Sequence, residues 1–351
     1  MFKINTKKLQ TILDKLAKVT PNKLLEITKY YKMMIDADGL SFSATDGNNF
    51  MFVTDSTVTG EAFETIVRAD QLTKLVNRTS VEEMKFNLTE NYLEVVGNGK
   101  YQIEILTEEE YPEPEDVEYG EFKEIDLNKL TSVINVNKNS VSRSIADGVL
   151  AGYRFNPENV TTSDSVKICI NPVKTGLDTL LTQDAINMIS ALTEEKVKAA
   201  SAEGSIQFIT DSTSLILTEM DGKNIYYDLS KFAEEEFPSS CELSKLSLIS
   251  ILERLTIFID PFKGNNVSLN FTKEGLEILT TSGSYEIISY NKSNNFKPFS
   301  CSVNVVLLKE LISAVTTETF TLSYGKTEML KIEFNGIAEI LATDESGDDN
   351  E

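Results

Sequence analysis

The chain has 351 residues, 41% of them hydrophobic and 25% charged, which is typical of a globular protein long enough for two or three domains. Its formal net charge is −22 and it contains no histidine, so the most common general base and metal ligand is missing. Three distant cysteines fit a reducing cytoplasm and predict neither a disulfide framework nor a zinc site. No apolar run reaches the roughly 18 residues of a membrane span, and the N-terminus does not read as a secretory signal.

The sequence opens with a short strand and an amphipathic helix. The apolar residues of this helix recur at the spacing of one helical face: Leu9, Ile12, Leu13 and Leu16. Lys8, Thr11, Lys15 and Lys18 are expected to project from the opposite, solvated side.

A turn at Thr45-Asp46-Gly47 then leads into a strand, and Asp70 is expected to cap a second helix. This helix has Leu72, Leu75 and Val76 on its apolar side and Gln71, Lys74 and Arg78 outside. Alternating segments around Gly97-Asn98-Gly99 predict a β-hairpin.

These features return twice further along the chain. The turn recurs at Ser163 and Ser282, offsets of 118 and 119 residues, and the helix start recurs at Asp184 and Asn304, offsets of 114 and 120. The opening strand and helix recur as FKEIDLNKLTSVI and CELSKLSLISILERL, and hairpins follow each second helix. The first two copies end alike, in Glu-Tyr-Pro and Glu-Phe-Pro.

The repeat predicts an α+β protein of three tandem modules, each with two helices and antiparallel strands. The expected boundaries are residues 1–119, 120–240 and 241–351, the third module ending in an acidic tail. The alternative, three unrelated α+β domains, would make the near-constant spacing accidental.

Charge is segregated along the chain. Residues 1–32 hold eight lysines and two acids, whereas residues 104–126 hold eleven acids and one lysine. Lysines on the predicted helices and acids in the connecting segments favour a phosphate-facing helix surface on a protein that otherwise repels nucleic acid. The alternative is that these lysines are ordinary solvated side chains.

No active site is visible. Gly325-Lys326-Thr327 lacks the earlier glycine of a phosphate loop, since Phe320 stands there, and reads as strand, turn and strand. Asp36-Ala37-Asp38-Gly39 reads as a hairpin turn and not as a calcium loop. We therefore expect a protein without enzymatic activity, cofactor or metal.

The three-module pattern resembles the bacterial DNA polymerase III β subunit, the sliding clamp family, over the whole chain. ATDGNNF, SDSVKICI, LAGYRF (150–155) and the EYP and EFP endings carry this resemblance. It implies a DNA-clamp module with two helices inside and antiparallel sheets outside, and a ring of two chains closed head to tail. It also implies a processivity factor that encircles duplex DNA and tethers a replicative polymerase in the cytoplasm.

The expected partners are duplex DNA of any sequence, a DNA polymerase, a clamp loader and a second copy, module 1 against module 3, with no membrane. Helix geometry places six cations towards the DNA: Lys8, Lys15, Lys18, Lys74, Arg78 and Lys309. The resemblance adds three cations in loops: Lys23, Arg143 and Lys263.

The resemblance also implies a partner-peptide pocket between modules 2 and 3. Its expected lining is Leu150, Val166, Lys167, Ile168, Pro238, Leu341 and Ala342. Leu150, Ile168 and Leu341 could equally be core residues.

The sequence departs from the family in three places. The family has a histidine and an arginine where Val166 and Lys167 stand, a longer linker after Pro238, and an apolar C-terminal tail where this sequence reads ATDESGDDNE. A clamp encoded by a virus or mobile element would fit such drift. Two other functions stay open: a scaffolding repeat protein without clamp activity, and a carboxylate-dependent enzyme.

Overall fold

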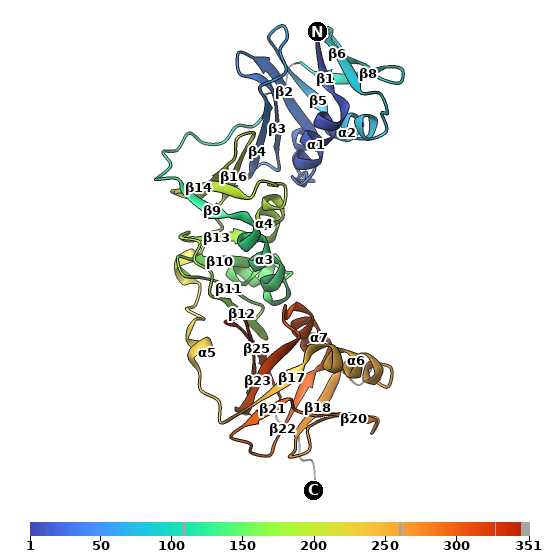
Figure 1. Cartoon of the computed structure of the whole chain (residues 1–351). Coiled ribbons are helices and arrows are strands. Elements are labelled where there is room, and N and C mark those ends of the chain that lie inside the picture. Colours follow the sequence, from blue (N-terminus) through green and yellow to red (C-terminus); the bar gives the residue numbers. More distant parts are fainter. Residues whose placement is uncertain (108–109, 260–261, 263, 327, 345–351) are drawn as a thin grey trace. The chain divides into compact units, whose positions relative to one another are not determined.

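The predicted opening strand and helix are both present in the computed structural model, which describes residues 1–107, 110–259, 262, 264–326 and 328–344 (Figure 1). Helix α1 (Thr6–Leu16) follows strand β1 (Phe2–Asn5). The side chain of Asn5 accepts hydrogen bonds from the backbone N–H groups of Lys7 (3.0 Å) and Lys8 (3.2 Å), which satisfies two helix donors. The predicted apolar face of α1 is buried, so local capping and burial agree on this element.

The chain divides into two compact units. The first comprises Met1–Thr131 and Leu181–Met220, and the second comprises Ser132–Leu180 and Asp221–Glu351. Helix α3 (Leu127–Asn137) and strand β13 (Thr179–Thr182) contribute residues to both units.

The first unit contains one twelve-stranded antiparallel sheet with helices α1, α2 and α4. Its further elements are β2 (Tyr30–Asp36), β3 (Gly39–Thr45), β4 (Phe50–Asp55), β5 (Phe63–Arg68), α2 (Ala69–Asn77), β6 (Glu83–Leu88), β7 (Tyr92–Val96), β8 (Lys100–Leu106), β9 (Lys123–Asp126), α4 (Gln183–Ile189), β14 (Lys196–Ala202), β15 (Ser205–Ile209) and β16 (Thr213–Thr218). Strand β4 pairs with β16, with Met51 opposite Leu215, so one sheet runs on from the strands of the first predicted module into those of the second. We call this pairing the first joint.

The second unit contains a nine-stranded and a four-stranded antiparallel sheet. Its elements are β10 (Gly152–Asn156), β11 (Asn159–Ser163), β12 (Lys167–Asn171), α5 (Lys231–Glu234), β17 (Ser239–Ser244), α6 (Lys245–Thr256), β18 (Asn266–Phe271), β19 (Leu276–Thr280), β20 (Tyr285–Ile288), β21 (Lys292–Asn294), β22 (Phe299–Asn304), α7 (Val305–Ala314), β23 (Thr319–Lys326), β24 (Met329–Phe334) and β25 (Ile337–Ala342). Strand β12 pairs with β25, with Cys169 opposite Glu339. This pairing is the second joint.

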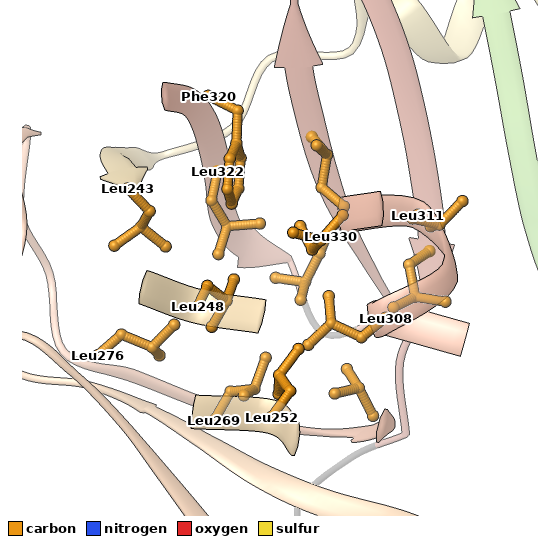
Figure 2. Close-up of a cluster of buried hydrophobic side chains, with 14 of the residues drawn as sticks. Leu243, Leu248, Leu252, Leu269, Leu276, Leu308, Leu311, Phe320, Leu322 and Leu330 are labelled. Atoms are coloured by element: carbon orange, nitrogen blue, oxygen red, sulfur yellow. The ribbon is translucent and has the colours of Figure 1, made fainter. Parts of the chain in front are cut away.

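Helices α6 and α7 bury leucines against these strands (Figure 2). Leu248 and Leu252 of α6 face Leu269 of β18, and Leu308 and Leu311 of α7 belong to the same buried cluster (Figure 2). The apolar side chains that recur with the helical period and those that alternate along the strands therefore pack into one core.

The order of elements confirms the predicted α+β fold. A strand, a helix, four strands, a second helix and three strands occur three times, opened by β1, β9 and β17; the third copy carries β21 as an addition. The Gly39 turn between β2 and β3 has φ 116°, and a Cβ there would lie 2.5 Å from the carbonyl oxygen of Asp55, so glycine is required. The Asp36–Gly39 segment is the predicted hairpin turn, and Lys326 ends a strand.

Two of the predicted helix caps are wrong. Asn304 does cap α7, accepting from the N–H groups of Val306 and Leu307. Asp70, however, lies in the first turn of α2, whose cap position is Arg68, and α4 is capped by the Thr182 hydroxyl and not by Asp184. The cap lies two residues earlier in both cases, because an acid in the first turn fits a helix N-terminus as well as a cap does.

Candidate functional site

The lysines of α1 fall on two faces. Lys8 and Lys15 turn towards the first joint: the Lys8 Nζ lies 3.0 Å from Thr57 Oγ1 and 3.6 Å from an Asp55 carboxylate oxygen. The Lys15 Nζ donates to Glu194 Oε1 and to Thr213 Oγ1, both at 3.0 Å. A pocket of about 410 Å³ lies beside these two lysines, between α1 and the ends of the joint strands.

Lys15 is therefore not the solvated cation that the helical pattern predicts. Only 7% of the residue is exposed. Glu194 and Thr213, which cover it, lie some 180 to 200 residues further along the chain, so the helical pattern could not show this burial. Partial burial raises the pKa of Glu194, but hydrogen bonds from Lys15 and from the Thr193 N–H outweigh it and hold the pKa below its usual value. The ammonium is thus committed to a carboxylate inside the protein.

Lys7 lies on another face of α1, and Lys18 lies 11 residues further on, in the turn directly after the helix. Both are exposed, as are Lys23 and Arg78, and no ion pair holds any of the four within the described residues. The side chain of Gln10 donates to the Val76 carbonyl (3.1 Å), which places the end of α2, and hence Arg78, beside α1. Lys7 is absent from the predicted set, although its spacing of 11 residues from Lys18 would have placed it on this face.

The remaining predicted cations are paired or outside the described residues. Lys74 lies 3.2 Å from Asp70, Lys309 lies 3.1 Å from Glu253, and Arg143 lies 3.5 Å from Glu310. Lys263 lies outside the residues that the structure describes. Exposed ion pairs of this kind are weak and exchange readily with water and salt, so they lower the local positive charge without fixing the side chains.

The exposed side chains of α3 and α4 are mostly neutral. On α3 these are Asn128, Thr131, Ser132 and Asn135, with Lys129 beside Asp126; on α4 they are Asp184 and Asn187. Amides and hydroxyls of this kind hydrogen-bond to phosphate oxygens without adding an ionic contact.

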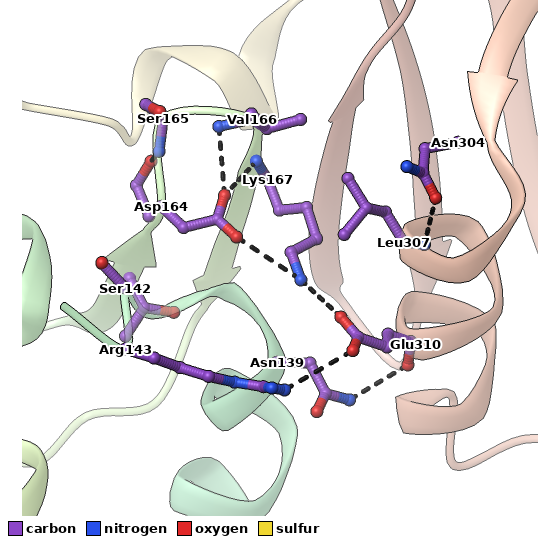
Figure 3. Close-up of polar contacts among 12 residues, drawn as sticks. Asn139, Ser142, Arg143, Asp164, Ser165, Val166, Lys167, Asn304, Leu307 and Glu310 are labelled. Carbon is purple, nitrogen blue, oxygen red and sulfur yellow. Dashed lines mark hydrogen bonds and ion pairs between the residues drawn. The ribbon is translucent and has the colours of Figure 1, made fainter. Parts of the chain in front are cut away.

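Lys167 organises a polar network at the second joint (Figure 3). It is only 4% exposed, and its Nζ lies 2.7 Å from Glu310 Oε2 on α7 and 3.4 Å from Asp164 Oδ2 in the turn before β12. Arg143 and the amide of Asn139 reach the same helix residue from the segment that follows α3 (Figure 3). Two carboxylates therefore neutralise the charge of Lys167.

The structure brings together part of the predicted peptide pocket. The Ala342 N–H donates to the Val166 carbonyl (2.9 Å), and Lys167 stands opposite Leu341 across the second joint. Val166 is 41% exposed and Ala342 is also exposed, while Ile168 is half-buried. Leu341 is fully buried in the core cluster, as is the aliphatic part of Lys167, so these two residues support the joint from below its surface.

Two other predicted pocket residues lie near this surface. Pro238 is exposed and packs against Gly325, where a Cβ would come within 3.2 Å of the proline ring. Leu150 is half-buried, and its carbonyl accepts from the Ser142 N–H at 3.0 Å.

A pocket of about 380 Å³ occurs at the first joint in the equivalent position. Asn48, Phe50, Ile216 and Thr218 line it, and they correspond in the strand pairing to Val166, Ile168, Ile340 and Ala342. The segment from Glu113 to Tyr119 also lines this pocket, and Tyr119 Oη lies 3.3 Å from Ser205 Oγ. The chain's own acidic connecting segment therefore borders the first of the two equivalent surfaces.

Two open strand edges occupy the positions that are paired in the two joints. Strand β20 is the outer strand of the four-stranded sheet, and Tyr285 and Ile287 on it are 59% and 45% exposed. Strand β8 pairs with β5 through only two residue pairs, Ile66 with Leu106 and Val67 with Ile105, which leaves the edge of its first residues free of that neighbour. Exposed apolar edges invite pairing with another strand.

Within the described residues no three His, Cys, Asp or Glu side chains gather to hold a metal ion, and all three cysteines are buried, which raises the pKa of each thiol. Among those residues no helix is long and apolar enough to span a membrane.

Comparison with known proteins identifies the fold. Residues 1–115 match the family model of the DNA polymerase III beta subunit, N-terminal domain. The whole chain is similar in structure to the DNA polymerase sliding clamp of Bacillus subtilis, with a TM-score of 0.88 and 15% identity, covering 97% of this chain and 98% of that one. The beta subunit of Streptococcus pyogenes gives a TM-score of 0.89 at 15% identity, over 98% and 100% of the two chains.

The beta subunit of Borrelia burgdorferi gives a TM-score of 0.86 at 16% identity, over 99% of this chain and 98% of that chain. No curated protein sequence matches the chain. The predicted resemblance to the bacterial sliding clamps is thus confirmed, in sequence for the first 115 residues and in fold for the whole chain.

Proposed function

We propose that this chain is a DNA sliding clamp, a processivity factor without catalytic activity that closes as a homodimeric ring around duplex DNA. The observation that carries the proposal is a strand pairing between modules that occurs twice in the chain, while the strand edges that would form a third such pairing are open within the described ranges. In each joint the fourth strand of one module pairs with the last strand of the next, β4 with β16 and β12 with β25. The fourth strand of the third module, β20, and the last strand of the first, β8, are the open edges.

The register of the missing joint follows from the two that exist. Met51, Cys169 and Glu286 hold the same place in their hairpins, opposite Ala44, Thr162 and Ile278. Leu215, Glu339 and Tyr101 hold the same place in theirs, opposite Phe208, Ile332 and Val95. Since Met51 faces Leu215 and Cys169 faces Glu339, Glu286 of one copy should face Tyr101 of the other, and Ile287 should face Lys100.

The surface beside β20 suits such a joint. Ile257 and Phe258, directly after α6, are exposed, and so are Tyr285 and Ile287 on β20, the strand that α6 contacts. Burying an apolar side chain of this size contributes about 1.5 to 3 kcal/mol, and pairing β20 removes an open edge at the same time.

The dimer is tested by Ile287→Lys, which places a second ammonium group opposite Lys100. Ile287 is partly exposed, so the variant should fold with an unchanged melting temperature and sediment as a monomer where the parent chain sediments as a dimer. Leu246→Lys, on the exposed side of α6 in the same module, is the matched control and should stay dimeric. A dimer that survives Ile287→Lys places the contact elsewhere.

DNA would be held by the ring's closure, with weak phosphate contacts from the outward cations Lys7, Lys18, Lys23 and Arg78. Lys8, Lys74, Lys309 and Arg143 would add contacts when their exposed ion pairs exchange, and Lys263, outside the described residues, stays a proposed contact. Lys15 is retained for the first joint. Weak and non-specific contacts suit sliding, because each ionic contact adds about 0.9 to the salt slope without reading a base.

A polymerase and a clamp loader would dock on the surface around the second joint, in the cytoplasm. Val166, Ile168, Pro238 and Ala342 offer the accessible part of that surface, supported by Leu150, Lys167 and Leu341. Replacing Val166 by glutamate should abolish binding of the cognate polymerase and leave the melting temperature unchanged, because this side chain is exposed. Retained binding in the folded variant would place the docking surface elsewhere.

A further inference from the structure

A buried carboxyl group stands in the middle of the second joint. Glu339 of β25 is 0% exposed, and within the described residues neither of its carboxyl oxygens has a hydrogen-bond partner. Ile337 and Leu341, which share its face of the strand, belong to the buried apolar cluster that also contains Cys169, the residue opposite Glu339. The carboxyl is thus enclosed by apolar side chains.

The module fold does not require an acid here. In the first joint the equivalent pair is Leu215 opposite Met51, and both residues are fully buried. The equivalent residue of the open strand β8 is Tyr101. Glu339 is therefore particular to the joint between β12 and β25.

The charged groups around Glu339 do not neutralise it. Lys167, two residues from Cys169 on β12, favours the ionised form, but its Nζ is already held by Glu310 and Asp164, and Arg143 adds a second cation on Glu310. Other titratable groups near this part of the sheet are the buried Cys169 thiol and the Tyr226 phenol, together with Lys331 and Glu333, which flank Ile332 on β24 and pair with each other. On β24 the residue opposite Glu339 is the apolar Ile332.

Burial dominates the acid–base behaviour of this group. It raises the pKa of Glu339 well above the ordinary value of 4.5, and the attraction of Lys167 opposes this only in part. The carboxyl is accordingly a neutral acid in the closed joint and an ionised one wherever the strands separate and water reaches it.

We propose that Glu339 makes the second joint proton-dependent: β12 and β25 stay paired while the carboxyl is protonated, and the pairing weakens as it ionises. The sign follows from linkage. A folded-state pKa above the unfolded value means that the stabilisation is complete below about pH 4.5 and is lost progressively as pH rises towards the folded pKa. Over that window the opening equilibrium constant should rise about tenfold per pH unit.

This inference deepens the proposed function, because Val166 and Ala342 of the docking surface lie on the same two strands. Opening of the joint would detach the Ala342 N–H from the Val166 carbonyl and so dismantle that surface. Partner binding would then weaken as pH rises, without any titrating group in contact with the partner.

The test is hydrogen exchange of the Ala342 amide in the full chain and in Glu339→Gln, a neutral side chain of nearly the same shape. The ratio of the two exchange rates cancels the intrinsic pH dependence of exchange. The parent chain should exchange increasingly faster than the variant, by about tenfold per pH unit above the ordinary glutamate pKa. Glu328→Gln makes the same substitution at an exposed glutamate in the turn before β24 and should leave the ratio at one.

A ratio that stays constant with pH, or a variant that exchanges faster than the parent chain, overturns the proposal. Should the glutamine variant fail to fold, Glu339→Leu, which copies Leu215 of the first joint, takes its place with the same expectation. Neither measurement needs DNA, a polymerase or a dimer, so failure here leaves the clamp proposal standing, and failure of the clamp proposal leaves this result interpretable.

Discussion

Replacing Lys7 and Lys18 together by glutamine tests whether the outward face of α1 contacts DNA. Both ammonium groups are exposed, and no ion pair engages them in the described part of the chain. Each ionic contact with duplex DNA contributes about 0.9 to the slope of log affinity against log salt concentration. Loss of two contacts per chain should therefore lower the slope by about 1.8 for one chain and by about 3.6 for a dimeric ring.

The assay is the fluorescence anisotropy of a labelled linear duplex, titrated with protein at a series of salt concentrations. The matched control replaces Lys8 and Lys74, which are also exposed but lie beside Asp55 and Asp70. Because those ammonium groups are already neutralised locally, their loss should lower the slope by less than one contact. Equal decreases in the two variants, or an unchanged slope after loss of Lys7 and Lys18, would refute the assignment of the two faces.

Two further predictions concern stability. Lys15→Met should cost about 1 to 3 kcal/mol of unfolding free energy in urea titrations, since it leaves Glu194 and the Thr213 hydroxyl without their partner. Because the pKa of Glu194 is lowered in the folded protein, its stabilisation is present at neutral pH and is lost as pH falls through the folded pKa. The unfolding free energy of the variant should therefore decrease less steeply with acidification than that of the parent chain. An unchanged pH dependence would contradict the pairing. Asn304→Ala should lower the unfolding free energy by about 1 kcal/mol, because it removes the α7 cap. Asp184→Ala should lower it by less, because Asp184 lies outside the α4 cap position. The reverse order would show that the caps are misassigned.

The sequence was sufficient for the repeat and for the faces of the helices. Leu9, Leu13 and Leu16 lie in the core as their spacing predicts, because a 3.6-residue period is a local property of the chain. The pairing of strands in the two joints could not be predicted from the sequence. Nothing near Lys15 in the sequence indicates Glu194, and nothing near Cys169 indicates Glu339, since each pair is assembled from segments more than 150 residues apart.

Contacts between residues distant in the sequence also limit the prediction of the site residues. Helical geometry separates a solvated face from a buried one, but it assigns Lys8, Lys15 and Lys18 to a single face. In the structure the next module covers Lys15, and Lys8 lies beside Asp55 of its own module. The resemblance placed Val166, Lys167 and Leu341 in one region, and they do meet across the second joint. It did not indicate that Lys167 would be covered and held by two carboxylates, because Glu310 reaches it from another module.

Images of single particles of the purified chain test the central proposal most directly. The account predicts closed rings of two chains with a central hole wide enough for duplex DNA, opened into single three-module chains by Ile287→Lys and left closed by Leu246→Lys. Particles of one chain at every concentration, or stacked arrays without a central hole, would contradict it.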